Sequence, residues 1–185
     1  IKASNSYSNG AIFNSSDRGR VAIFIDGSHL FYTASQLSLD IDYAKLLDRL
    51  AEGAPVLRTF FYTANEQQRR CLARMRQQGY HAGTQNLIQF PTPVKSINLH
   101  QQIHADIKIL AGYYDTAVLV SGEEELAYTV KAVRRQGVRV EVVSWRDLTS
   151  DKLREAADCY VDIETIKKDI QTDVNFDFIE QLMAA

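Results

Sequence analysis

Acidic side chains gather at two places where an apolar run of the sequence ends. Asp26 follows the run Val-Ala-Ile-Phe-Ile at residues 21–25, and Glu123-Glu124-Glu125 follow the run at 116–120 after Ser121-Gly122. A third acid, Asp106, stands in the segment before the second run. Converging carboxylates repel one another unless a cation neutralises them, and oxygen-rich clusters suit Mg²⁺ or Mn²⁺. The pattern predicts a divalent-metal site, with helix capping as the alternative role of each acid.

Both apolar runs have the pattern of strands that are buried on two faces. Neither 21–25 nor 116–120 shows polar alternation, which is typical of parallel strands covered by helices. We therefore expect these runs to be adjacent central strands. The carboxyl ends of such strands form the working edge of the sheet, so Asp26 and Glu123 should meet there. We expect Gly27 and Gly122 to let the backbone turn sharply at this edge.

Strands and helices alternate along the rest of the chain. An extended segment is expected at 80–90 and a loop at Pro91 and Pro93, and Ser150 is expected to cap a helix. This order predicts an α/β fold with a mostly parallel central sheet. Further strands are predicted at 56–62, 138–143 and 160–163, and helices at 28–37, 43–50, 66–78, 97–112, 126–136 and 150–158.

Length and composition limit the class of protein. The 185 residues suit one domain, and the net charge of -2 excludes a protein that coats nucleic acid through bulk charge. Two cysteines are too few for a disulfide framework. No apolar run approaches the ~20 residues of a membrane span. We expect a cytoplasmic protein without a membrane partner.

The chain is expected to divide into a central domain and two tails. Half of residues 1–16 are Ser or Asn, a composition that cannot bury itself. We therefore assign residues 1–19 to a flexible N-terminal tail and residues 20–171 to the folded domain. Residues 172–185 are assigned to a C-terminal helical tail.

Four blocks of the sequence resemble a known family in their order and spacing. They are residues 21–30, 114–122, 137–142, and 149–153 followed by Ala157-Asp158. Residues 20–170 are similar to NYN domains of the PIN-like nuclease superfamily, in the bacterial LabA-like branch. The resemblance implies a three-layer PIN-like fold and a metal-dependent ribonuclease site of clustered acids at the carboxyl edge. The branch also contains regulators, for example of circadian output.

The resemblance assigns roles to positions of this chain, and four of six positions depart from the family pattern. Asp26 matches the first acid of the family and Asp106 matches an acid on the central helix. His29 stands where Asn is usual, and His100 stands where Asp is usual. Glu123 and Glu125 both replace Asp in the pattern S-G-D-x-D-F.

These replacements weaken a site for a hard cation. Glu adds one methylene to Asp, and Mg²⁺ tolerates a shifted carboxylate poorly because it demands near-ideal octahedral geometry. His100 removes a negative charge and offers an imidazole nitrogen, which suits Mn²⁺ or Zn²⁺ better. The expected cofactor is therefore Mg²⁺ or Mn²⁺ at a weakened site. His104, one helical turn after His100, is an alternative ligand.

Two functions remain open. In the first, Asp26, Asp106 and Glu123 hold the ion, Glu125 completes the shell, and the bound metal activates water for attack on RNA. In the second, the protein is a degraded, LabA-like regulator that binds RNA or a protein without cleavage. Phosphotransfer of the receiver or haloacid-dehalogenase type is strongly disfavoured, because the latter family needs a second Asp at position 28, which is Ser here.

RNA is the expected partner. The basic residues Arg69, Arg70 and Arg74 would form one face of the helix at 66–78 and contact phosphates, as would Ser121. A solvated helix face is the alternative interpretation of the arginines. A regulatory protein partner and a homodimer also remain open.

Charge crowding is expected at the site. The four acids of the site should raise one another's pKa, because neighbouring like charges disfavour ionisation. These acids are Asp26, Asp106, Glu123 and Glu125. His29 and His100 beside them should be favoured as imidazolium. Such a site would neutralise itself without a metal.

Overall fold

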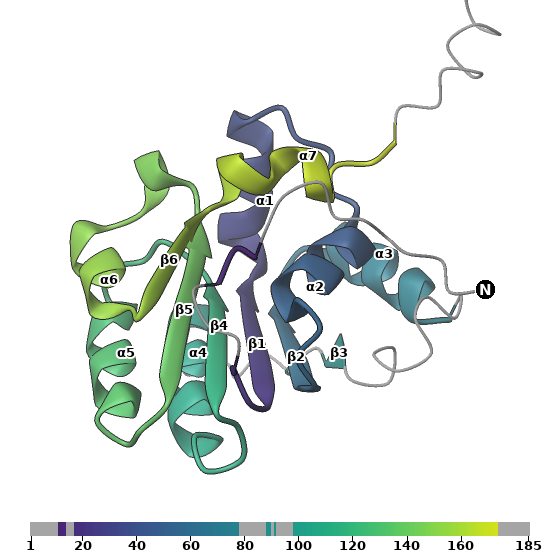
Figure 1. Cartoon of the computed structure of the whole chain (residues 1–185). Coiled ribbons are helices and arrows are strands. Elements are labelled where there is room, and N and C mark those ends of the chain that lie inside the picture. The colour runs from purple at the N-terminus through teal and green to yellow at the C-terminus, as the bar shows by residue number, and fades with distance from the viewer. Residues whose placement is uncertain (1–10, 14–16, 78–87, 90, 92–97, 174–185) are drawn as a thin grey trace, which may run out of the picture.

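One parallel sheet organises the molecule. The computed structural model describes residues 11–13, 17–77, 88–89, 91 and 98–173, without the side chains of 71–72, 74–77 and 88–89. Within these residues six strands pair in the order β3-β2-β1-β4-β5-β6, all parallel (Figure 1). The strands are β1 (Val21–Asp26), β2 (Val56–Tyr62), β3 (Ile88–Gln89), β4 (Thr116–Val120), β5 (Arg139–Ser144) and β6 (Cys159–Asp162).

The two unbroken apolar runs are the central strands. β1 pairs with β2 on one side and with β4 on the other, in a register that sets Ala22 opposite Ala117 and Ile25 opposite Val120. Every residue of both strands is buried. The prediction that these runs are adjacent, central and parallel is confirmed.

Helices cover both faces of the sheet and complete three layers. Alternate residues of β1 enter two cores: Ala22 and Phe24 pack with α4, α5 and α6, while Ile23 and Ile25 pack with α1, α2 and α7. In the described ranges, no helix is both long and apolar enough to cross a membrane. The helices are α1 (Gly27–Gln36), α2 (Tyr43–Ala51), α3 (Glu66–Gln77), α4 (Leu99–Ile109), α5 (Leu126–Arg134), α6 (Asp151–Ala156) and α7 (Lys167–Ile170), with short 3₁₀ turns at Arg146–Leu148 and Ile163–Ile166.

The predicted elements match the structure closely, with one wrong cap. Ser150 precedes α6, but its side chain makes no capping hydrogen bond. Its backbone N–H donates to Gly122 at 3.0 Å and its hydroxyl donates to Glu124 at 3.4 Å, so the side chain points away from the helix. Of the extended segment predicted at 80–90, only β3 is described. The loop predicted at Pro91 and Pro93 lies almost wholly outside the described residues.

Part of the predicted N-terminal tail packs onto the domain. Phe13 is only 1% exposed, and the Glu52 carboxylate accepts hydrogen bonds from the backbone N–H groups of Ile12 and Phe13. Arg18 lies over the Phe13 ring and donates to buried Glu141. The prediction of a flexible tail is therefore wrong for 11–13 and 17–19, because one aromatic ring and one arginine bury themselves despite the polar composition. Residues 1–10, 14–16 and 174–185 lie outside the described residues.

Candidate metal centre

The carboxyl ends of four neighbouring strands build one edge. Asp26 ends β1 and lies opposite Tyr62 at the end of β2. Ser121 directly follows β4, and Ser144 ends β5. Since parallel strands present their carboxyl ends together, four polar side chains from separate parts of the chain become neighbours there.

Asp26 is the most constrained acid at this edge. Its side chain is 1% exposed at the end of a central strand. One oxygen, Oδ1, accepts from the backbone N–H of His29 at 3.1 Å and so caps α1. The other, Oδ2, lies 3.0 Å from Nε2 of His100 and accepts from the Ser121 hydroxyl at 3.4 Å. Capping and site geometry, considered as alternatives from the sequence, thus use different oxygens of one carboxylate.

Three side chains converge in a group that could hold a metal ion. One donor atom each from Asp26, His100 and Glu123 lies within 4.8 Å of the other two. In the described part of the chain this is the one such group of three or more. An imidazole with two carboxylates is a donor set that fits a divalent transition metal. The predicted meeting of Asp26 and Glu123 at one edge is confirmed, and His100 joins them from the start of α4.

Asp106 lies apart from this group. It is six positions after His100 on α4, about 9 Å along the helix axis, and α4 runs back from the carboxyl edge. Its Oδ2 accepts a hydrogen bond from the Tyr62 hydroxyl at 2.8 Å. Burial raises the pKa of Asp106, and the Tyr62 hydrogen bond opposes that shift. The shift has desolvation as its cause, so the prediction that crowding among carboxylates raises this pKa is wrong.

The three consecutive glutamates lie in different environments. Glu123 belongs to the converging group, while Glu124 is fully exposed and forms an ion pair with Lys152 at 2.6 Å. The Lys152 ammonium lowers the pKa of Glu124. Glu125 is exposed at the residue before α5 and caps nothing with its side chain. Of the two glutamates predicted to serve the metal, the structure brings Glu123 alone into the group.

His29 is held beside the site by its neighbours. Its Nε2 lies 2.7 Å from the Ser144 hydroxyl. Burial lowers the pKa of His29, and this outweighs the opposing charges of Asp26 and Glu123. The prediction that His29 is favoured as imidazolium is therefore wrong, because its ring is desolvated more strongly than it is attracted.

The two glycines of the edge serve close packing. Neither Gly27 nor Gly122 has a positive φ, so the expected sharp turns do not explain them. A Cβ on Gly122 would overlap the Leu148 carbonyl oxygen and lie 2.7 Å from Cε1 of His29. A Cβ on Gly27 would lie 2.8 Å from the carbonyl oxygen of Tyr62. Both positions exclude a side chain, and this lets the walls of the site approach one another.

His104, the alternative ligand, faces a different partner. Its Nδ1 pairs with the Thr129 hydroxyl on α5, and burial lowers the pKa of His104. It is not a member of the converging group. His104 therefore joins α4 to α5, and the i, i+4 spacing from His100 does not produce a shared site.

The residues predicted to bind RNA occupy three kinds of environment. Arg69 donates to the Thr63 carbonyl at 3.2 Å, and Arg70 pairs with Glu66 on the exposed face of α3. The side chain of Arg74 lies outside the described residues. Ser121 is fully buried against Asp26. Arg70 is thus the most exposed of these groups whose side chains are described.

Sequence reasoning missed two polar residues of the edge. Tyr62 and Ser144 are the last residues of β2 and β5, and they hold Asp106 and His29. The signal was present, because both strands were predicted and the carboxyl-edge rule applies to every parallel strand. Neither residue is acidic, so a pattern based on carboxylates does not include them.

Three comparisons place the chain among known proteins. A family model described as NYN domain matches residues 20–164. The chain is 26% identical over 163 residues to the "Low amplitude and bright protein LabA" of Synechococcus elongatus, covering 82% of this chain and 88% of that protein. A solved structure from Vibrio parahaemolyticus, titled a protein of unknown function, matches with a TM-score of 0.67 and 20% identity, over 86% of this chain and 100% of that one. The structural likeness shows the fold alone.

Proposed function

Because the chain belongs to the NYN domain family, we propose that it binds a divalent cation through Asp26, His100 and Glu123 and hydrolyses RNA at that edge. The observation behind this proposal is the convergence of three donor atoms within 4.8 Å of one another. Two carboxylates and one imidazole fit Mn²⁺ or Zn²⁺ better than Mg²⁺, which prefers oxygen ligands throughout. Mn²⁺ is therefore the first ion to test.

The residues at the carboxyl edge would have different roles in holding the cation. A cation held there supplies positive charge to a phosphate oxygen and lowers the pKa of a coordinated water. Asp26 provides the fixed ligand, because a central strand, the His29 backbone N–H and the Ser121 hydroxyl hold its carboxylate. His100 must present a lone pair at Nε2, so its proton must lie on Nδ1. Asp106 and Glu125 lie outside the converging group and are not expected to be ligands.

The contact between His100 and Asp26 also supports a second candidate function. Nε2 of His100 lies 3.0 Å from Oδ2 of Asp26, so an N–H at this nitrogen would satisfy the buried carboxylate without any metal. A domain built this way keeps its fold while losing catalysis. It would act as a regulator that binds RNA or protein, the alternative favoured by the four altered positions.

An RNA degradation assay separates the two functions. The purified 185-residue chain is incubated with single-stranded RNA and Mn²⁺, Mg²⁺ or Zn²⁺, with and without a chelator. If the protein is a nuclease, chelator-sensitive cleavage appears with Mn²⁺ and is abolished in Asp26→Asn, which retains an oxygen to cap α1. Wild type that stays inert over all three ions supports the regulator.

The consecutive glutamates provide a matched control. Glu123→Gln removes a charge from the converging group, whereas Glu124→Gln removes one from an exposed ion pair next to it. The proposal expects cleavage to be lost in the first variant and kept in the second. Equal loss in both would show that general negative charge matters, and not a metal site.

A further inference from the structure

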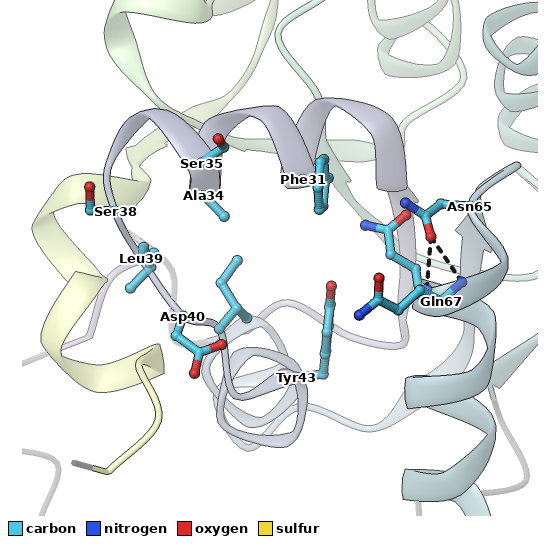
Figure 2. A pocket seen from close by; sticks show the side chains of 11 residues that line it. Phe31, Ala34, Ser35, Ser38, Leu39, Asp40, Tyr43, Asn65 and Gln67 are labelled. Atoms are coloured by element: carbon cyan, nitrogen blue, oxygen red, sulfur yellow. Dashed lines mark hydrogen bonds between the residues drawn. The ribbon is translucent and has the colours of Figure 1, made fainter. Parts of the chain in front are cut away.

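A pocket of about 540 Å³ opens between α1, α2 and the start of α3. One wall includes Phe31, Ala34 and Ser35, which occupy i, i+3 and i+4 along α1 and so share a face, and Ser38 lies just after the helix. Figure 2 shows Phe31 and Tyr43 projecting from opposite walls, with Asn65 and Gln67 at one end. The pocket is separate from the three converging side chains, none of which lines it.

The lining suits a flat, uncharged ring with polar edges. Phe31 is 56% exposed and lines the pocket, so a flat group that enters the pocket can stack on its ring. Oδ1 of Asn65 accepts from the backbone N–H groups of Gln67 and Gln68, which leaves the amide NH₂ of Asn65 to donate elsewhere. The Gln67 side chain is exposed and offers both a donor and an acceptor. Aromatic faces with amide edges are the groups that hold an unstacked nucleobase.

The charges of the pocket exclude a phosphate as its occupant. In the described part of the chain, the one charged side chain that lines it is Asp40, and no lysine or arginine does. An anion placed there would meet a carboxylate without a compensating cation. The base of a nucleotide fits this environment, and its phosphate must lie outside.

The pocket is connected to the acidic edge. Phe31 stands five positions after Asp26, about 7.5 Å along α1. Gln68, which lines the pocket, donates to the carbonyl of Gly27 at 3.0 Å and accepts from Thr63 at 2.6 Å. One hydrogen-bonded residue therefore joins the pocket to the backbone that follows Asp26.

From these observations we infer that the pocket holds one nucleobase of a single-stranded RNA whose backbone passes the acidic edge. This inference rests on the proposed action on RNA and adds a subsite that positions the strand. Phe31 and Tyr43 contact the base through their rings, while Asn65 and Gln67 contact its polar edge.

The test compares two neighbouring aromatic residues. Phe31 and Tyr32 are 56% and 54% exposed, but Tyr32 does not line the pocket. Binding of a short fluorescent single-stranded RNA to the full chain is measured in EDTA, so that cleavage cannot interfere. Phe31→Ala should weaken binding roughly tenfold, the loss of one stacked base, and Tyr32→Ala should leave it unchanged. Equal affinities of wild type and Phe31→Ala would overturn the inference, whatever the cleavage assay shows.

Two further experiments identify the ligand of the pocket. An RNA that lacks bases should bind wild type and Phe31→Ala equally, and a remaining difference would contradict stacking on a base. The side-chain amide NMR signals of Asn65 and Gln67 should shift with the oligonucleotide far more than with nucleoside monophosphates. Equal shifts with free nucleotides would overturn the RNA strand as the source, and no shift with either would overturn the pocket. If wild type binds the RNA as expected but does not cleave it with any metal ion, only the proposed hydrolysis is rejected.

Discussion

The Asp26 carboxylate divides its two oxygens between two tasks. Oδ1 caps α1 through the backbone N–H of His29, and Oδ2 faces His100 and Ser121. A neutral amide at this position can still accept the capping hydrogen bond but cannot supply the charge. Asp26→Asn therefore separates metal binding from folding, which a larger change at position 26 would not do.

Asp106 should lower stability in its ionised form. Its pKa is raised by burial, so the folded pKa lies above the unfolded value and the ionised carboxylate costs stability at neutral pH. This cost is relieved as the pH falls through the folded pKa towards the unfolded one. Asp106→Asn should raise the melting temperature at pH 7, and the difference from wild type should shrink towards about pH 4. Thermal unfolding followed by circular dichroism measures both.

Asp106→Ala is the matched variant for this prediction. It removes the same charge, and it also removes the group that accepts the hydrogen bond of the Tyr62 hydroxyl. Tyr62 is only 1% exposed. An unpaired buried hydroxyl costs about 1–3 kcal/mol. Asp106→Ala should thus be less stable than Asp106→Asn at pH 7, and the reverse order would contradict this account of the pair.

At the residue scale, the site could be predicted only in part. Asp26 and Glu123 were predicted together, because each follows an apolar strand that ends at the same edge. His100 entered through the family resemblance, which does not show that its imidazole reaches Asp26. The separation of Asp106 from the group depends on the path of α4 across the sheet, which helix periodicity alone does not specify.

At the element scale, Gly122 allows the turn that follows β4 to pack closely against the segment before α6. The Leu148 carbonyl and the His29 ring occupy the space where a Cβ would lie. The Gly122 carbonyl also accepts from the backbone N–H of Ser150 at 3.0 Å. Any side chain at this position would push the wall of the site outwards.

Gly122→Ala should therefore destabilise the protein by about 3 kcal/mol, the upper end of typical overpacking. A backbone oxygen cannot rotate away as a side chain can, so the chain itself must move. Gly112→Ala is the control, since a Cβ there meets nothing within 4 Å and its φ is not positive. Urea denaturation of both variants gives the comparison, and a Gly122→Ala variant as stable as Gly112→Ala would refute the packing argument.

Elements were predicted better than their ends. The unbroken apolar runs identify β1 and β4 because only strands covered on both faces tolerate them. The capping role of Ser150 failed because its hydroxyl lies within reach of Glu124, a tertiary contact that local sequence does not show. Tertiary partners compete with local caps, so cap residues are the less predictable part of a helix.

At the scale of the whole molecule, a buried ion pair ties the N-terminal segment to the sheet. Arg18 and Glu141 are 6% and 0% exposed, and their closest atoms lie 2.6 Å apart. Arg18 also donates to the carbonyls of Leu50 and Ala51 at the end of α2. Residues that are 123 positions apart in the chain thus share one contact. Composition alone predicts a loose tail, because it does not show that Arg18 has a buried ion-pair partner in the sheet.

Arg18→Ala should destabilise the protein by about 3 kcal/mol, because it leaves Glu141 buried with Arg139 as its remaining charged partner. Arg20→Ala removes an exposed arginine two positions on and should change stability by less than about 0.5 kcal/mol. Chemical denaturation measures both variants. Equal stability of the two would show that the N-terminal segment contributes little to the fold.

The central claim is that Asp26, His100 and Glu123 form one metal site in a domain of the NYN family. Titration of the full chain with Mn²⁺ by isothermal calorimetry at neutral pH tests it without relying on catalysis. We expect wild type and Glu124→Gln to bind one ion per chain, and Asp26→Asn and His100→Ala to bind at least about tenfold more weakly. Wild type that binds no ion, or Asp26→Asn that binds as tightly as wild type, would contradict the claim.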